Sequence, residues 1–126
     1  MKFSLDDSTR VNLVRGYAAG EVQVGGVVYR RSLIVAGDAL VTDWPVHDAA
    51  LLDVRDLGAI EALAPEVVLL GTGEHQVFPP PRLFAHFAGR GIGFEVMDNG
   101  AACRTYNVLV TEGRRAVCAL ILSAAS

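Results

Sequence analysis

Cys103 is the residue whose chemistry would be most reactive if the fold left it accessible. It lies five residues after Asp98 and directly before Arg104. In the first turn of a helix, beside an arginine, a cysteine can have a lowered pKa and act as a nucleophilic thiolate. Catalysis also needs a positioned base, and no spacing ties any of the three histidines to Cys103. We therefore expect a buried, inert thiol, with the reactive thiolate as the alternative.

The segment that follows Asp98 predicts a helix with two distinct faces. Either Asp98 or Asn99 can cap this helix by accepting a backbone N–H of its first turn. At about 100° per residue, one arc of the helix is apolar and another is polar. The apolar arc holds Ala102, Cys103, Tyr106, Leu109 and Val110, and the polar arc holds Arg104, Asn107 and Thr111. Cys103 lies at the margin of the apolar arc, which suits a partly shielded thiol.

A glycine-rich loop is the second candidate for chemistry. Gly71, Thr72 and Gly73 follow an apolar run, and two glycines let the backbone pass close to another group while Thr72 adds a hydroxyl. A dinucleotide fingerprint would need a third glycine and an immediate helix, whereas Val-Phe-Pro-Pro-Pro follows at residues 77–81. We expect a tight turn that needs positive φ angles, with nucleotide binding as the alternative.

These two segments are expected to lie together. Ligand sites in sheets with parallel strands lie beyond the carboxyl ends of the strands, and both segments follow predicted strands. The Arg104 guanidinium carries five donors, which we expect to bind carbonyls of the glycine-rich loop and to order it. The candidate ligand or partner site therefore consists of Gly71, Thr72, Gly73, Asp98, Cys103, Arg104 and Asn107.

No residue pattern indicates a metal or a cofactor. His47, His75 and His86 lie in different segments, and Cys103 and Cys118 lack the spacing of a metal site. Both cysteines lie among apolar residues, as buried free thiols do. We expect no metal, no cofactor and no disulfide.

The composition narrows the class of protein. A formal net charge of -3 argues against a nucleic-acid partner, because phosphate binding needs a basic surface. The longest apolar run, residues 116–122, is shorter than the roughly 20 residues of a membrane-spanning helix, so no membrane insertion is expected. Asp6 and Asp7 stand where a signal peptide would need apolar residues, which favours the cytoplasm.

The secondary structure expected to position these residues differs between the first third of the chain, which is mostly strands, and the rest, in which helices and strands alternate. Residues 12–18, 21–24 and 27–36 read as strands, and Gly25-Gly26 predicts a two-residue antiparallel hairpin. Helices near 51–63, 82–88 and 101–112 then alternate with strands at 67–70, 93–97 and 116–122. The apolar strands 67–70 and 116–122 should be neighbours or near-neighbours inside one sheet. We expect one α/β domain over residues 1–126, with a mixed sheet that has the N-terminal antiparallel hairpin at one end and the parallel strands of the alternating part at the other.

One combination of motifs is similar to a known family. It consists of Met-Asp-Asn-Gly-Ala-Ala-Cys-Arg-Thr-Tyr-Asn at 97–107 with Glu112-Gly113-Arg114, Gly71-Thr72-Gly73, and Gly91-Ile92-Gly93 with Glu95. In these residues the chain resembles a family of small domains of unknown biochemical function, which includes the mitochondrial NADH dehydrogenase (complex I) assembly factor three and an adipogenesis-associated protein. The resemblance covers residues 28–122, with Asn99 where the family usually has threonine. It implies a three-layer α/β domain with a mixed central sheet and a surface site formed by the two loops.

Two hypotheses about function follow. The first is a protein-binding accessory or assembly-factor-like domain, with an unidentified protein partner, as the resemblance implies. The second is a small-molecule binder or minor enzyme that uses a pocket between the glycine-rich loop and residues 98–107. A concave pocket lined by both segments would favour a ligand, and an apolar patch would favour a protein.

Overall fold

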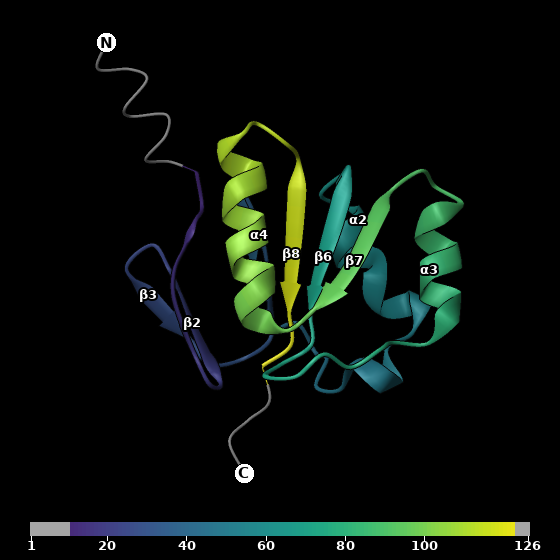
Figure 1. Ribbon diagram of the computed structural model, residues 1–126, viewed down its shortest axis with the longest axis horizontal. Coiled ribbons are helices and arrows are strands. Elements are labelled where there is room, and N and C mark those ends of the chain that lie inside the picture. The colour runs from purple at the N-terminus through teal and green to yellow at the C-terminus, as the bar shows by residue number, and fades with distance from the viewer. Residues whose placement is uncertain (1–10, 123–126) are drawn as a thin grey trace.

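The computed structural model describes residues 11–122, so the expectation based on Asp6 and Asp7 lies outside the described residues. Within this range the chain forms eight strands and five helical segments (Figure 1). The strands are β1 (Val14–Ala18), β2 (Glu21–Val24), β3 (Val27–Tyr29), β4 (Leu33–Ala36), β5 (Ala39–Val41), β6 (Val67–Gly71), β7 (Gly93–Met97) and β8 (Ala116–Leu120). The helical segments are η1 (Ala49–Leu51), η2 (Val54–Leu57), α2 (Gly58–Glu61), α3 (Pro81–Ala88) and α4 (Asn99–Thr111).

A mixed sheet of five strands forms the centre, in the order β5-β4-β8-β6-β7. β6 is parallel to both of its neighbours, whereas β4 is antiparallel to β8 and to β5. β8 is buried at every position and β6 at all but its first. Their sequences are apolar throughout because both faces are covered. The prediction that residues 67–70 and 116–122 form neighbouring interior strands is confirmed, with β8 ending at Leu120.

A smaller antiparallel sheet contains β1, β2 and β3. Val24 pairs with Val27 across Gly25-Gly26, and Gly25 has a φ of +62°. The predicted two-residue hairpin is therefore confirmed. The expectation that this hairpin belongs to the mixed sheet is wrong, because it lies in a sheet of its own. The antiparallel end of the five-stranded sheet is formed by β4 and β5, and the sequence did not indicate β5.

The single strand expected over residues 27–36 is wrong, because the chain changes sheets after Tyr29. Ser32 marks the point of entry into the larger sheet. Its buried hydroxyl donates to the carbonyl of Val46 at 2.6 Å and accepts the N–H of Leu122 at 2.9 Å. The exposed Arg30 and Arg31 before it form the connection between the sheets.

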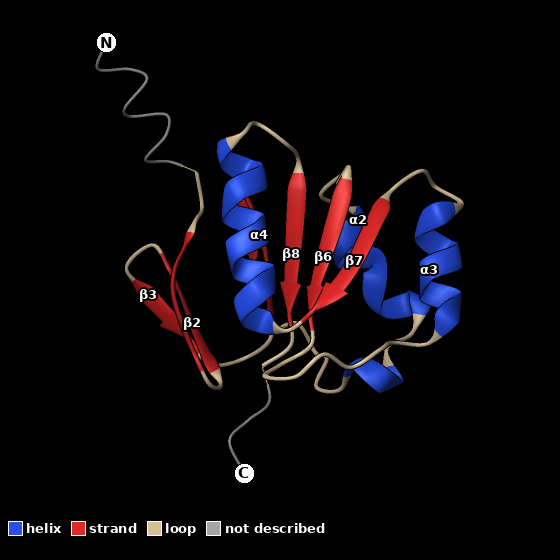
Figure 2. Ribbon diagram, viewed as in Figure 1, coloured by secondary structure: helices blue, strands red, loops and turns tan. Residues whose placement is uncertain are grey.

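Helices cover both faces of the five-stranded sheet, which makes the fold a three-layer α/β domain (Figure 2). Ile34 and Leu70 point to one face and pack in a cluster with Leu83 of α3. Leu69 points to the other face and packs in a cluster with Tyr106 of α4. The small sheet lies beside α4 and contributes to this second cluster (Figure 1).

The helix expected over residues 51–63 forms only as the short pieces η1, η2 and α2. Asp53 explains the break. Its backbone is extended, its carboxylate accepts the N–H of Val54 at 2.6 Å, and its own N–H donates to the carboxylate of Asp56 at 2.9 Å. This capping box starts a new helical turn where the sequence pattern predicts continuity. In residues 11–122, no helix combines the length and apolar character needed to cross a membrane.

Candidate functional site

The start of α4 meets the loop after β6, as expected for the carboxyl ends of parallel strands. Asp98 is the N-cap of α4, and its side chain accepts the N–H of Ala101 at 2.9 Å. Of the two capping candidates, Asp98 therefore has this role. Asn99 is left free to make other contacts.

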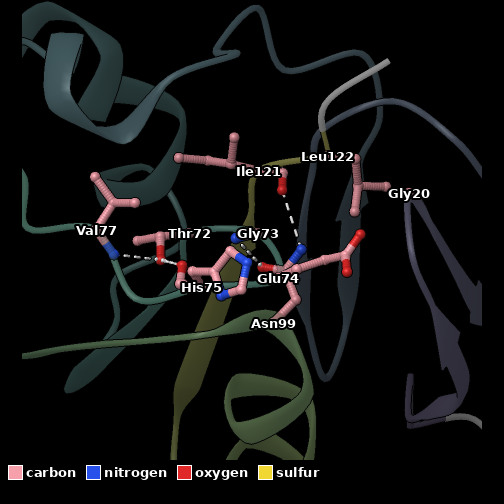
Figure 3. Close-up of a pocket in the computed structure, with 9 residues that line it drawn as sticks. All are labelled: Gly20, Thr72, Gly73, Glu74, His75, Val77, Asn99, Ile121 and Leu122. Carbon is pink, nitrogen blue, oxygen red and sulfur yellow. Dashed lines mark hydrogen bonds between the residues drawn. The ribbon is translucent and has the colours of Figure 1, made fainter. Parts of the chain in front are cut away.

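Asn99 joins α4, the glycine-rich loop and the end of β8 (Figure 3). Its side-chain oxygen accepts the N–H of Gly73 at 3.0 Å, and its side-chain nitrogen donates to the carbonyl of Ile121 at 3.0 Å. Its backbone N–H donates to the carbonyl of Gly73 at 2.8 Å. The residue is only 2% exposed, so these partners replace water completely. Sequence reasoning considered Asn99 only as a cap and missed this junction.

The two glycines of the loop are required for different reasons, one for close packing and the other for its backbone conformation. A Cβ on Gly71 would lie against Asn99 Oδ1 and at 2.7 Å from Leu120 Cδ2, which is closer than real contacts allow. Gly73 has a φ of +109°, a conformation that other residues rarely adopt. The expected turn with positive φ is thus confirmed at Gly73, whereas Gly71 is required by close packing.

Thr72 holds the rest of the loop in shape. Its hydroxyl donates to the carbonyl of His75 at 2.6 Å and accepts the N–H of Val77 at 3.0 Å. Gln76 adds a hydrogen bond from its side chain to the carbonyl of Val96 in β7, at 2.9 Å. The loop is therefore fixed by its own hydrogen bonds and by contacts with β7 and α4.

A pocket of about 370 Å³ lies beside this junction (Figure 3). The exposed side chains of Glu74 and His75 line it, and the turn between β1 and β2 contributes Gly20. The full lining is Gly20, Thr72, Gly73, Glu74, His75, Val77, Asn99, Ile121 and Leu122. Of the predicted site residues, only Thr72 and Gly73 lie in this pocket.

The remaining predicted residues on α4 line a different pocket, of about 260 Å³, between β1 and α4. Cys103, Arg104 and Asn107 all contribute to it. Among residues 11–122, no hydrogen bond joins Arg104 to the glycine-rich loop, so the prediction that Arg104 orders this loop is wrong there. Asn99 holds the loop instead. The structure thus places Thr72 and Gly73 in one pocket and Cys103, Arg104 and Asn107 in another, while Gly71 and Asp98 line neither.

Cys103 is buried, with 4% of its surface exposed. Burial raises the pKa of its thiol to about 11, against an opposing effect of the Arg104 charge and a small further rise caused by Asp98. Burial also raises the pKa of Cys118, which lies on β8 beneath α4. The expected shielding of Cys103 is confirmed, and a thiol with a raised pKa is a poor nucleophile at neutral pH.

Asn107 attaches β1 to α4, and Tyr106 attaches the segment before β1. The Asn107 side chain accepts the N–H of Val14 and donates to its carbonyl, both at 2.9 Å. The Tyr106 hydroxyl donates to the carbonyl of Asn12 at 2.6 Å. Asn107 therefore has a structural role that its place on the polar arc of the helix did not reveal.

Tyr17 of β1 was not among the predicted site residues. It lines the smaller pocket, and its pKa is raised by burial and then by the charges of Glu74 and Asp98. No group of three His, Cys, Asp or Glu side chains within residues 11–122 is arranged to hold a metal ion.

A family model described as a protein of unknown function (DUF498/DUF598) matches residues 14–121. A 13 kDa major membrane protein of Francisella tularensis is 37% identical over 76 residues, which cover 60% of this chain and 62% of that protein. The NADH dehydrogenase [ubiquinone] 1 alpha subcomplex assembly factor 3 is 30% identical in Xenopus tropicalis and 35% in Danio rerio, over 83 residues and 64% of this chain. The chain spans only 45% and 48% of those two proteins.

Two solved structures have the same fold. A Xanthomonas campestris protein has a TM-score of 0.84 and 41% identity, covering 91% of this chain and 87% of that one. A Bordetella pertussis protein described as an Mth938-like domain has a TM-score of 0.78 and 32% identity, covering 94% and 90%.

Proposed function

Since this chain belongs to the DUF498/DUF598 family of proteins of unknown function, we propose that it is a protein-binding accessory domain with an assembly-factor-like role. Two of its relatives carry the name of an assembly factor for NADH dehydrogenase, which supports this class of function. The partner would be a protein of a respiratory complex or of another membrane enzyme during its assembly. The cytoplasm remains the proposed compartment.

The observation that carries the proposal is an aromatic side chain displayed by a rigid loop. Phe78 is 67% exposed and Val77 is 38% exposed, directly after the loop that Thr72 and Gln76 hold in place. Pro79, the next residue, is buried and fixes the far end. Exposed aromatic side chains on preorganised backbone are typical of the central residues of protein interfaces. Little conformational entropy would be lost when such a loop binds a partner.

The test compares two variants, each of which replaces a different exposed apolar residue. Phe78→Ala removes the proposed anchor, and Val108→Ala removes an exposed apolar side chain of α4 as a matched control. Proteins recovered from the native host with the wild type and with Val108→Ala, but lost with Phe78→Ala, would support the proposal. With a purified partner, Phe78→Ala should weaken binding by about 30-fold or more. Equal recovery by all three forms would contradict it.

A second candidate function is small-molecule binding in the pocket of about 370 Å³. The observation in its favour is the placement of Glu74 and His75 on the pocket wall beside the fixed Asn99 junction. Native mass spectrometry of the gently purified protein tests it. A metabolite that co-purifies with the wild type and is lost in Glu74→Gln would support this function, and an unliganded protein from the native host would oppose it.

A further inference from the structure

The smaller pocket, between β1 and α4, is lined by positively charged side chains, although the protein has a net charge of -3. Arg15 and Arg104 both line it, one from each element, and no carboxylate is among its lining residues. The full lining is Val14, Arg15, Gly16, Tyr17, Gly100, Cys103, Arg104 and Asn107. This pocket shares no lining residue with the pocket of about 370 Å³, and Phe78 does not line it.

A bulge in β1 places Arg15 at this position. Val14 pairs with Val24 and Gly16 with Gln23, so Arg15 is the extra residue of an irregular register. A bulge of this kind changes the direction of a side chain and commonly occurs beside binding sites. The neighbouring Val14 is held against α4 by Asn107, which fixes the distance between the two walls.

Gly100 forms the base of the pocket on the α4 side. A Cβ at this residue would lie 3.3 Å from Arg104 Nη1 and 3.5 Å from Tyr17 Cε2. The guanidinium of Arg104 and the ring of Tyr17 therefore both extend over Gly100. A methyl group there would contact the Tyr17 ring and would require the Arg104 guanidinium to shift by a few tenths of an ångström.

Two acidic side chains, Asp98 and Glu74, lie close enough to raise the pKa of Tyr17, but neither lines the pocket. Asp98 is the nearest, and its Oδ1 accepts the N–H of Ala101 at the N-cap. Glu74 lines the other pocket. Within residues 11–122, neither Arg15 nor Arg104 has a carboxylate within ion-pair distance, whereas Arg30, Arg31, Arg90, Arg114 and Arg115 all do. Among the described residues, no carboxylate therefore takes up the donors of either guanidinium group.

We propose that this pocket binds a small oxyanion with two negative charges, between Arg15 and Arg104. Guanidinium groups form bidentate hydrogen bonds with both phosphate and carboxylate oxygens. Tyr17, which also lines the pocket, adds a hydroxyl that can donate a hydrogen bond. A volume of about 260 Å³ suits a phosphate group or a short dicarboxylate rather than a larger molecule.

The test is a titration followed by NMR amide shifts, with inorganic phosphate in one series and succinate in the other, at constant ionic strength. Gly16 and Gly100 report on the pocket, and Gly113, in the turn after α4, reports on non-specific effects. A saturable shift of the first two glycines with either anion would support the proposal. Binding of phosphate alone assigns a phosphate ligand, and binding of succinate alone assigns a dicarboxylate.

Variants distinguish specific binding in the pocket from non-specific electrostatic attraction of the anion to the protein. Arg15→Gln and Arg104→Gln should each raise the dissociation constant about tenfold or more, because each removes a charged donor. Arg82→Gln, on α3 across the sheet, removes the same charge elsewhere and should change it little. Gly100→Ala keeps every charge and should weaken binding severalfold. The proposal is overturned if neither anion gives a saturable shift, or if Arg82→Gln weakens binding as much as Arg104→Gln.

Discussion

Replacing Asn99 by alanine should remove the junction between α4, the glycine-rich loop and β8. The buried carbonyl of Ile121 would lose its partner, which costs about 1–3 kcal/mol, and the half-buried N–H of Gly73 would lose about 0.5–1.5 kcal/mol. The better helix propensity of alanine returns roughly 0.5 kcal/mol. We expect a net loss of about 1–4 kcal/mol, a large share of the stability of a domain of this size.

Asn107→Ala is the matched control for this measurement. Asn107 lies on the same helix and also makes two side-chain hydrogen bonds to backbone, but both are only half-buried, so the groups left unpaired on Val14 can be hydrated. Urea unfolding followed by the fluorescence of the single, buried Trp44 gives both free energies of unfolding. Hydrogen exchange of the Gly73 amide should accelerate in Asn99→Ala and remain slow in Asn107→Ala.

Asn99→Asp provides an independent check through pH. The substitution keeps the acceptor for Gly73 but turns the donor toward Ile121 into a second acceptor. Burial beside a carbonyl should raise the pKa of the new carboxyl above its unfolded value. Its protonated form can donate to Ile121, so the stability deficit should be small at low pH and should grow as pH rises through the folded pKa. An Asn99→Ala cost no larger than that of Asn107→Ala, or a deficit in Asn99→Asp that does not change with pH, would refute the reasoning.

Gly71→Ala should lower the free energy of unfolding by about 1–3 kcal/mol in the same urea assay, since its methyl group would overlap Leu120; an unchanged midpoint would mean that the loop can shift. Burial raises the pKa of Cys103 from its ordinary 9.0 to about 11, so its contribution to stability is complete below pH 9 and is lost as pH rises toward 11. Cys103→Ala should therefore flatten that alkaline decline, and the folded wild type should react with iodoacetamide more slowly than a free thiol. Arg104→Ala should leave the hydrogen exchange of Gly73 unchanged, and faster exchange would restore the role first predicted for Arg104.

The central strands were predictable because their local sequences carry the whole signal. β6 and β8 are apolar on both faces, and only an interior strand between two layers explains such a run. The break after Tyr29 had no comparable signal, since β3 and β4 are joined by a short, charged segment that also fits a continuous strand. What separates them is the Ser32 hydroxyl, whose partners are distant in sequence.

The meeting of the glycine-rich loop with the start of α4 was predictable from topology, but the side chain that joins them was not. Arg104 follows Asn99 by five residues, which rotates it about 140° around the helix. When Asn99 faces the loop, Arg104 is therefore turned away from it, and in the structure it lines a pocket with β1. The sequence pattern does not indicate which of the two polar residues faces which neighbour, because β1 lies about ninety positions away in the chain.

The hydrogen bonds from Asn107 to Val14 also affect how this molecule behaves beside its own copies. β1 is an edge strand of a sheet with only three strands, and unpaired edges invite pairing with a second chain and aggregation. At Val14 the carboxamide of Asn107 occupies both backbone groups that an incoming strand would use. At this end of β1, a side chain of α4 thus takes the place of a residue of a fourth strand, which disfavours pairing with a second molecule there.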